Sequence, residues 1–126
     1  MFSNTWKGKV ILIVEDDEVS LEFLKELLTP SRVEILVAGD GTDAIDIAKN
    51  RKDIDLILMD VQLPTMSGKD AMLNIREFNE SVPIIAQTAF AMSGDKEKYL
   101  AMGFDNYISK PINVTDLIDM IENCFE

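Results

Sequence analysis

Five polar residues of this sequence have the chemical types that phosphoryl transfer to a carboxylate requires. Glu15, Asp16 and Asp60 are carboxylates, Thr88 has a hydroxyl group, Lys110 is a cation, and each follows an apolar run. Crowded carboxylates repel one another, and a hard divalent cation such as Mg²⁺ relieves that repulsion and holds phosphate oxygens. Asp60 can then attack phosphorus, while Lys110 and Thr88 stabilise the phosphoryl oxygens.

These side chains can act together only if the fold brings the ends of several strands to one place. Residues 9–14 (KVILIV) and 55–59 (DLILM) are apolar runs typical of strands buried on both faces of a parallel sheet. Three further strands are predicted at 33–38, 82–86 and 107–108. The carboxyl ends of parallel strands share one edge of a sheet, where ligands bind at the topological switch point. The five polar residues are therefore expected to line one pocket.

Segments with helical periodicity separate these strands. A first helix, ended by Pro30, is predicted by an apolar stripe: Val19, Phe23, Leu24, Leu27 and Leu28. A second is predicted around 44–48, and three later helices have the N-cap residues Ser67, Ser93 and Asn113, with Gly103 as the end of the helix that Ser93 begins. Five strands alternating with five helices predict a three-layer, doubly wound α/β domain with right-handed crossovers.

Length and composition limit the remaining choices. The 126 residues, 47% of them hydrophobic, suffice for one domain at 9–126, and residues 1–8, which have no clear period, are expected to be a tail or linker. Cys124 is the single cysteine, and the first apolar run is too short for a signal peptide or membrane span, so a cytoplasmic location is expected. The formal net charge of -11 disfavours direct nucleic-acid binding. The chain has no histidine, so histidine chemistry must come from a partner.

Four segments resemble the response regulator receiver family of two-component signalling: residues 11–17 (ILIVEDD), 56–68 (LILMDVQLPTMSG), 83–89 (PIIAQTA) and 107–112 (YISKPI). The similarity extends from Val10 to Phe125, and residues 88–112 are most similar to receiver domains of hybrid histidine kinases. It implies a flavodoxin-like five-stranded parallel sheet in the order 2-1-3-4-5. It also implies a phosphoacceptor switch rather than an enzyme, one that promotes its own phosphorylation and slow dephosphorylation.

The resemblance further implies that Asp60 receives a phosphoryl group from a partner phosphohistidine in a Mg²⁺-dependent reaction, after which the domain changes conformation. The donor would be a histidine kinase, a histidine phosphotransfer protein, or a kinase domain upstream in the same chain. The resemblance implies that the metal is held by Glu15, Asp16, Asp60 and the main-chain carbonyl of Gln62, and that Asp60, Thr88 and Lys110 carry out catalysis. It implies that Thr88 and Tyr107 form the conformational switch, and that Gln62 and Phe90 influence the rate of hydrolysis of the phosphoryl group. It also implies a cis peptide bond between Lys110 and Pro111.

Each residue also has a common structural explanation, and only the joint pattern indicates function. Asp16 and the acidic residues after it can stabilise a helix N-terminus, Asp60 can begin a turn, and Tyr107 can be an inert aromatic. A rival enzyme is a magnesium-dependent phosphatase of the haloacid dehalogenase type, which typically has a second aspartate where this chain has Gln62. A second rival is an interaction module with a vestigial site, although no residue required for phosphorylation is missing.

Overall fold

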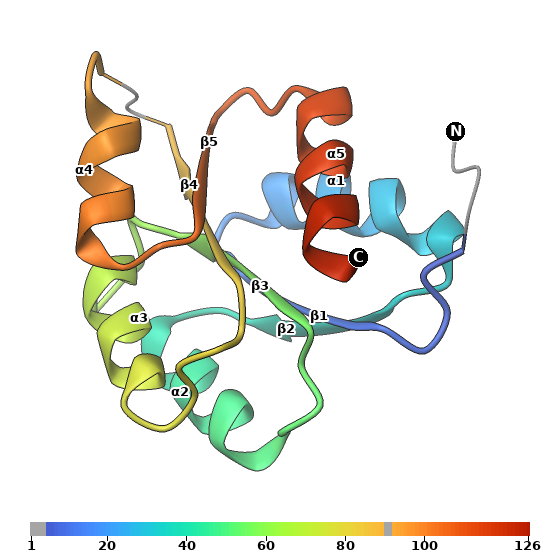
Figure 1. The fold of residues 1–126 in the computed structure, drawn as a ribbon, viewed down its shortest axis with the longest axis horizontal. Coiled ribbons are helices and arrows are strands. Elements are labelled where there is room, and N and C mark those ends of the chain that lie inside the picture. The colour runs from blue at the N-terminus through green and yellow to red at the C-terminus, as the bar shows by residue number, and fades with distance from the viewer. Residues whose placement is uncertain (1–4, 90–91) are drawn as a thin grey trace.

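The computed structural model describes residues 5–89 and 92–126 of the chain (Figure 1). Five strands and five helices alternate along it, as predicted. The strands are β1 (Val10–Val14), β2 (Glu34–Ala38), β3 (Leu56–Asp60), β4 (Ile84–Thr88) and β5 (Asn106–Ser109). The helices are α1 (Glu18–Leu28), a 3₁₀ turn η1 (Thr29–Ser31), α2 (Gly41–Asn50), α3 (Gly68–Arg76), α4 (Asp95–Met102) and α5 (Val114–Phe125).

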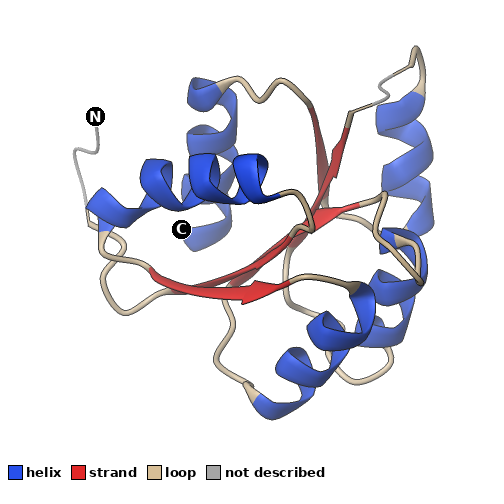
Figure 2. Ribbon diagram, turned by 180° about the vertical axis from the view of Figure 1, so that it is seen from behind, coloured by secondary structure: helices blue, strands red, loops and turns tan. Residues whose placement is uncertain are grey.

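All strand pairs are parallel, and the order β2-β1-β3-β4-β5 confirms the prediction of a doubly wound sheet. Helices α1 and α5 cover one face, and α2, α3 and α4 cover the other (Figures 1 and 2). The register joins Val14 to Met59, Asp60 to Gln87 and Thr88 to Ser109. The carboxyl ends of β1, β3, β4 and β5 are therefore level, so the polar residues at these ends meet.

Each face of the sheet has its own hydrophobic core, because side chains alternate along a strand. Ile11 and Ile13 face α1 and α5, whereas Leu12 and Val14 face α2 and α3. Every residue of β1, β3 and β4 is buried, which explains why these segments are apolar in the sequence apart from Asp60, Gln87 and Thr88. Fully burying one such aliphatic side chain contributes about 1.5–3 kcal/mol.

The predicted apolar stripe of the first helix is only partly buried. Leu24 and Leu28 are fully buried, but Val19 is 79% exposed and Phe23 is 42% exposed. These two members of the stripe line a groove with Lys110, Pro111 and Ile112 instead of packing on the sheet. Pro30 does end the helix, since it lies in η1 directly after Leu28.

Two local predictions differ from the structure around β4. The strand begins at Ile84 rather than at residue 82, because Pro83 has no N–H group to contribute to the ladder. Ser93 is not the N-cap of α4; Gly94, with φ +86°, has that position without a side-chain bond, and the Asp95 carboxylate accepts a bond from the Met92 N–H. The predicted caps Ser67 and Asn113 and the helix end at Gly103 are confirmed.

The chain is packed onto the domain before β1 begins. Trp6 is 6% exposed, donates its main-chain N–H to the Ser31 carbonyl and meets Phe125 edge-on at 5.4 Å. Thr5 donates its hydroxyl to the same carbonyl. The description of residues 1–8 as a tail or linker stays a prediction, but its last part contacts both η1 and α5.

Candidate functional site

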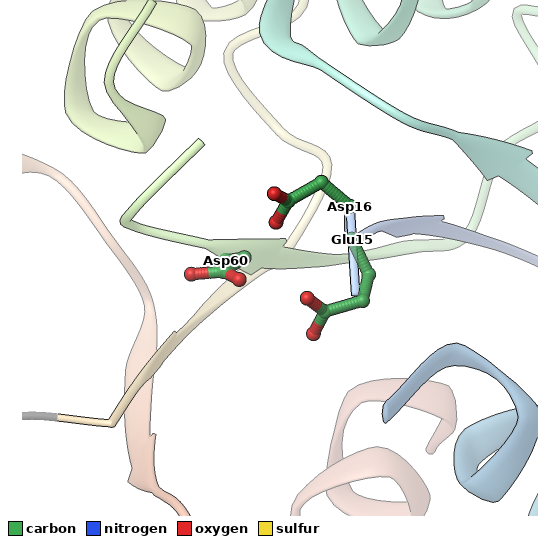
Figure 3. Close-up of side chains that lie close together, drawn as sticks. All are labelled: Glu15, Asp16 and Asp60. Atoms are coloured by element: carbon green, nitrogen blue, oxygen red, sulfur yellow. The ribbon is translucent and has the colours of Figure 1, made fainter. Parts of the chain in front are cut away.

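Three carboxylates from two neighbouring strand ends converge at the carboxyl edge of the sheet (Figure 3). Asp60 is the last residue of β3 and is 5% exposed, Glu15 follows β1 directly and is 2% exposed, and Asp16 is exposed. One oxygen of each carboxylate lies within 4.8 Å of the other two. The predicted acidic cluster is therefore present, and its oxygens are the ligand type that hard divalent cations prefer.

Lys110 places a cation beside the two buried carboxylates. Its Nζ lies 2.8 Å from Glu15 Oε1 and 3.5 Å from Asp60 Oδ2. The Lys110 main-chain N–H donates to the Thr88 carbonyl, which keeps the residue level with the end of β4. Burial lowers the pKa of Lys110, but the hydrogen bond to Glu15 and the charge of Asp60 outweigh this and raise it, so the ammonium stays charged. The peptide bond from Lys110 to Pro111 is cis, as predicted.

Main-chain groups orient both buried carboxylates. The Gln62 N–H donates to Asp60 Oδ1 at 2.8 Å, and the Asp17 N–H donates to Glu15 Oε2 at 3.2 Å. Gly68 packs against the main chain of Asp60 so closely that a Cβ at this position would collide with the Asp60 carbonyl oxygen. The loop after β3 therefore requires glycine at position 68 to keep Asp60 in place.

Crowding in a buried site changes the protonation of Glu15. The pKa of this carboxyl is raised from its ordinary value of 4.5 to about 7, chiefly because the group is buried. The hydrogen bonds from Lys110 and from the Asp17 N–H lower the pKa, and the neighbouring Asp60 raises it, so the net shift is upward. Neutralising the cluster with a cation would therefore favour the ionised form of Glu15.

Stabilisation of a helix N-terminus accounts for Asp17 but not for Asp16. The Asp17 carboxylate caps α1 by accepting from the Ser20 N–H at 2.9 Å, and this bond lowers the pKa of Asp17. Asp16, one residue earlier, belongs to the carboxylate cluster instead.

Thr88 and Tyr107 lie on neighbouring strands, on the face opposite to Asp60. Thr88 is the buried last residue of β4, and Tyr107 pairs with Ala86 two residues earlier in that strand. The Tyr107 ring stacks on Tyr99 of α4, with centroids 5.3 Å apart and planes 12° from parallel. Its hydroxyl is buried and has no hydrogen-bond partner among the described residues, and burial raises its pKa.

Of the two residues expected to influence hydrolysis of the phosphoryl group, the structure describes only Gln62. Gln62 is exposed and lines a groove of about 320 Å³ that also contains Thr88 and Tyr99. Phe90 lies outside the described residues, so its expected part in excluding water stays a prediction.

Sequence reasoning missed Tyr99 and Gln87. Tyr99 belongs to a helix with no buried residue and little periodicity, so nothing in the sequence marks it as a partner of Tyr107. Gln87 interrupts the apolar run PIIAQTA, and this signal was available.

Comparison with known proteins shows the family of this chain. A sequence model of the response regulator receiver domain matches residues 11–122. The chain belongs to this receiver family. The rival phosphatase family is thereby set aside as a description of the fold and site.

The receiver domain has relatives in signalling proteins of several organisms. The hybrid signal transduction histidine kinase I of Dictyostelium discoideum is 44% identical over 119 residues, which cover 88% of this chain and only 7% of that kinase. The receiver domain of sensor histidine kinase PA1611 from Pseudomonas aeruginosa PAO1 has a magnesium ion coordinated in its active site cleft; it is 34% identical, with a TM-score of 0.83 over 92% of this chain and 96% of that one.

A third relative was solved with its signalling partner. The receiver domain of the Saccharomyces cerevisiae response regulator Ssk1, in a co-crystal with the histidine phosphotransfer protein Ypd1, is 32% identical to this receiver. Its TM-score is 0.84, and the match covers 94% of this chain and 89% of that one.

None of the helices in the described part of this chain has the length and apolar character needed to cross a membrane.

The raised pKa of Glu15 predicts how stability depends on pH in metal-free buffer. A carboxyl whose folded pKa is raised stabilises the fold fully below its unfolded value of 4.5, and this contribution is lost as the pH rises through about 7. The free energy of unfolding of the parent should therefore fall between pH 5 and pH 8 by roughly 2 kcal/mol more than that of Glu15→Gln. Urea denaturation with chelator at several pH values measures this, and parallel pH profiles would show that Glu15 is not perturbed.

Proposed function

We propose that this receiver domain is a phosphoacceptor switch in which Asp60 receives a phosphoryl group from a partner phosphohistidine. A carboxylate oxygen of Asp60 forms the new bond to phosphorus, and the bond from phosphorus to the imidazole nitrogen breaks with its electron pair left on the nitrogen. The observation that best supports this is the position of Lys110, whose ammonium lies between Glu15 and Asp60. The same cation can hold an incoming phosphoryl oxygen.

The residues present fit a Mg²⁺ ion, because the carboxylate oxygens of three acidic side chains are gathered and, among the described residues, Lys110 is the one cation that contacts them. Asp16, Asp60 and the main-chain carbonyl of Gln62 would hold it, with Glu15 through water. When bound, the ion neutralises the charge of the carboxylates and of the phosphoryl oxygens. Thr88, at the end of β4, would donate its hydroxyl to a phosphoryl oxygen.

The switch acts on itself rather than turning over a substrate. Gln62 has no useful acid or base group at the position where a hydrolase would need one, so we expect slow loss of the phosphoryl group by attack of water. The proposal places the domain in the cytoplasm, which suits the one cysteine, Cys124, since it is free and only half-buried.

An exposed apolar groove beside the site is the proposed docking surface for the donor. The groove has a volume of about 320 Å³ and is lined by Val19, Ser20, Phe23, Lys110, Pro111 and Ile112. Val19 and Phe23 expose apolar area here that the sheet leaves uncovered. A histidine phosphotransfer protein seated on this groove would bring its phosphohistidine next to Asp60, and Ssk1 is a related receiver that binds such a partner.

The change of conformation is proposed to pass through Thr88 and Tyr107 to α4. The hydroxyl of Tyr107 is buried without a partner among the described residues, so this ring position depends on packing, most directly on the stack with Tyr99. Movement of Thr88 toward a phosphoryl group changes the packing on the face that Tyr107 shares. Phosphorylation would thus shift the population of two arrangements of the α4–β5 surface.

Labelling with acetyl phosphate and Mg²⁺ tests the acceptor. Mass spectrometry should find one added phosphoryl group on the parent and none on Asp60→Asn, because an amide cannot form an acyl phosphate. Asp17→Asn is the matched control, since Asp17 is a neighbouring carboxylate that caps α1, and it should be labelled like the parent. Equal labelling of Asp60→Asn would refute the assignment, and undiminished labelling in excess chelator would exclude the metal.

Docking is tested by comparing two equally exposed residues on different faces. Phe23→Ser should slow phosphoryl transfer from phosphorylated Ypd1 about tenfold, because apolar contact at the interface is lost, and should leave labelling by acetyl phosphate unchanged. Leu73→Ser on α3, where the parent side chain is 43% exposed, should change neither rate. Equal transfer to both variants would show that the donor docks elsewhere.

The path to α4 is tested with beryllofluoride, a phosphoryl mimic. In the parent, the mimic and Mg²⁺ should change NMR chemical shifts throughout α4 and β5. Tyr99→Ala removes the ring that stacks on Tyr107 and should abolish most of the changes in α4, whereas Tyr99→Phe keeps the stack and should retain them. Undiminished changes in Tyr99→Ala would mean that the signal reaches α4 by another route.

A further inference from the structure

Gln87 is a fully buried polar residue next to the carboxyl end of β4. Its exposed fraction is 0%, and neither the amide nitrogen nor the amide oxygen of its side chain has a hydrogen-bond partner among the described residues. A buried amide without partners destabilises a fold, and an apolar side chain of the same size would avoid that penalty. A polar residue at this position therefore needs a reason other than packing.

The strand register places Gln87 beside the phosphoacceptor. Gln87 pairs with Asp60 on β3 and with Ile108 on β5. Paired residues of parallel strands point to the same face, and adjacent strands are about 4.8 Å apart. The side chain of Gln87 thus lies on the face of α1 and α5, the side to which Ile108 packs. Asp60 is flanked by Glu15 after β1 on one side and by Gln87 of β4 on the other.

The neighbours of Gln87 have matching hydrogen-bonding capacity. An ammonium group has three donors, and the acceptors described for Lys110 are Glu15 at 2.8 Å and Asp60 at 3.5 Å, the second a long contact. The amide oxygen of Gln87 needs a donor, and its NH₂ group needs an acceptor. Asp60 is paired with Gln87 in the register, and Lys110 follows β5 two residues after Ile108, the other partner of Gln87. These two charged groups can supply an acceptor and a donor.

We propose that Gln87 is a positioning residue for Lys110. Its amide oxygen accepts a hydrogen bond from the ammonium group, directly or through one buried water, when that group turns from Glu15 toward a phosphoryl oxygen on Asp60. The bond to a charged donor replaces part of what Lys110 loses by leaving Glu15. This inference rests on the proposed function of Asp60 and adds a residue that acts through Lys110.

A pair of variants separates this role from packing. Gln87→Met keeps the size of the side chain and removes the amide, so the protein should be at least as stable to urea as the parent. Its labelling by acetyl phosphate at saturating Mg²⁺ should nevertheless be about tenfold slower, the loss expected for one hydrogen bond to a charged group. Ile108→Val, a packing change at the strand neighbour of Gln87, should be less stable and labelled at the parental rate.

A double-mutant cycle with Lys110→Ala decides whether the effect passes through Lys110. In that background Gln87→Met should slow labelling no further, whereas a purely structural role would slow it by the same factor in both backgrounds. Labelling of Gln87→Met at the parental rate, or an equal slowing with and without Lys110, would overturn the inference. If the parent itself were not labelled at Asp60, the proposed function would fail instead, so the two failures are distinguishable.

Discussion

The structure depends on holding several carboxylates close together with one cation among them. Glu15 and Asp60 are buried, Asp16 lies beside them, and the Nζ of Lys110 reaches both buried groups. Their repulsion tends to separate the strand ends, and the parallel ladders on either side of β3 oppose that separation. Additional positive charge at this site would relieve the repulsion among the carboxylates.

In the proposed function, the chemistry and the communication take place on opposite faces of the sheet. Asp60, Glu15 and Lys110 belong to the side of α1 and α5, where the exposed groove with Phe23 is also found. Thr88 and Tyr107 point to the side of α4. Successive residues of a strand point to opposite faces. In the proposed function, a change at Asp60 on one face can therefore alter the packing of Thr88 and Tyr107 on the other face.

Sequence reasoning predicted the fold and the acidic cluster because both depend on patterns that repeat along the chain. A buried strand such as β3 is apolar over residues 56–59, so the polar Asp60 at its end is conspicuous. It did not show that Val19 and Phe23 are exposed, because helical periodicity says which residues share a face but not whether that face meets the sheet. It also could not find the stack of Tyr99 on Tyr107, which depends on how α4 is placed in space.

Trp6 is the single tryptophan of the chain, and it packs edge-on against Phe125 near the start of β1, at the end of that strand away from Glu15. Its indole is thus an optical reporter of the amino-terminal edge and of the last turn of α5. Intrinsic fluorescence will follow global unfolding while staying nearly silent to ions and phosphoryl mimics at the opposite edge. Ligand-induced stabilisation can therefore be read from the emission of the natural chain, without a dye and without correction for quenching at the site.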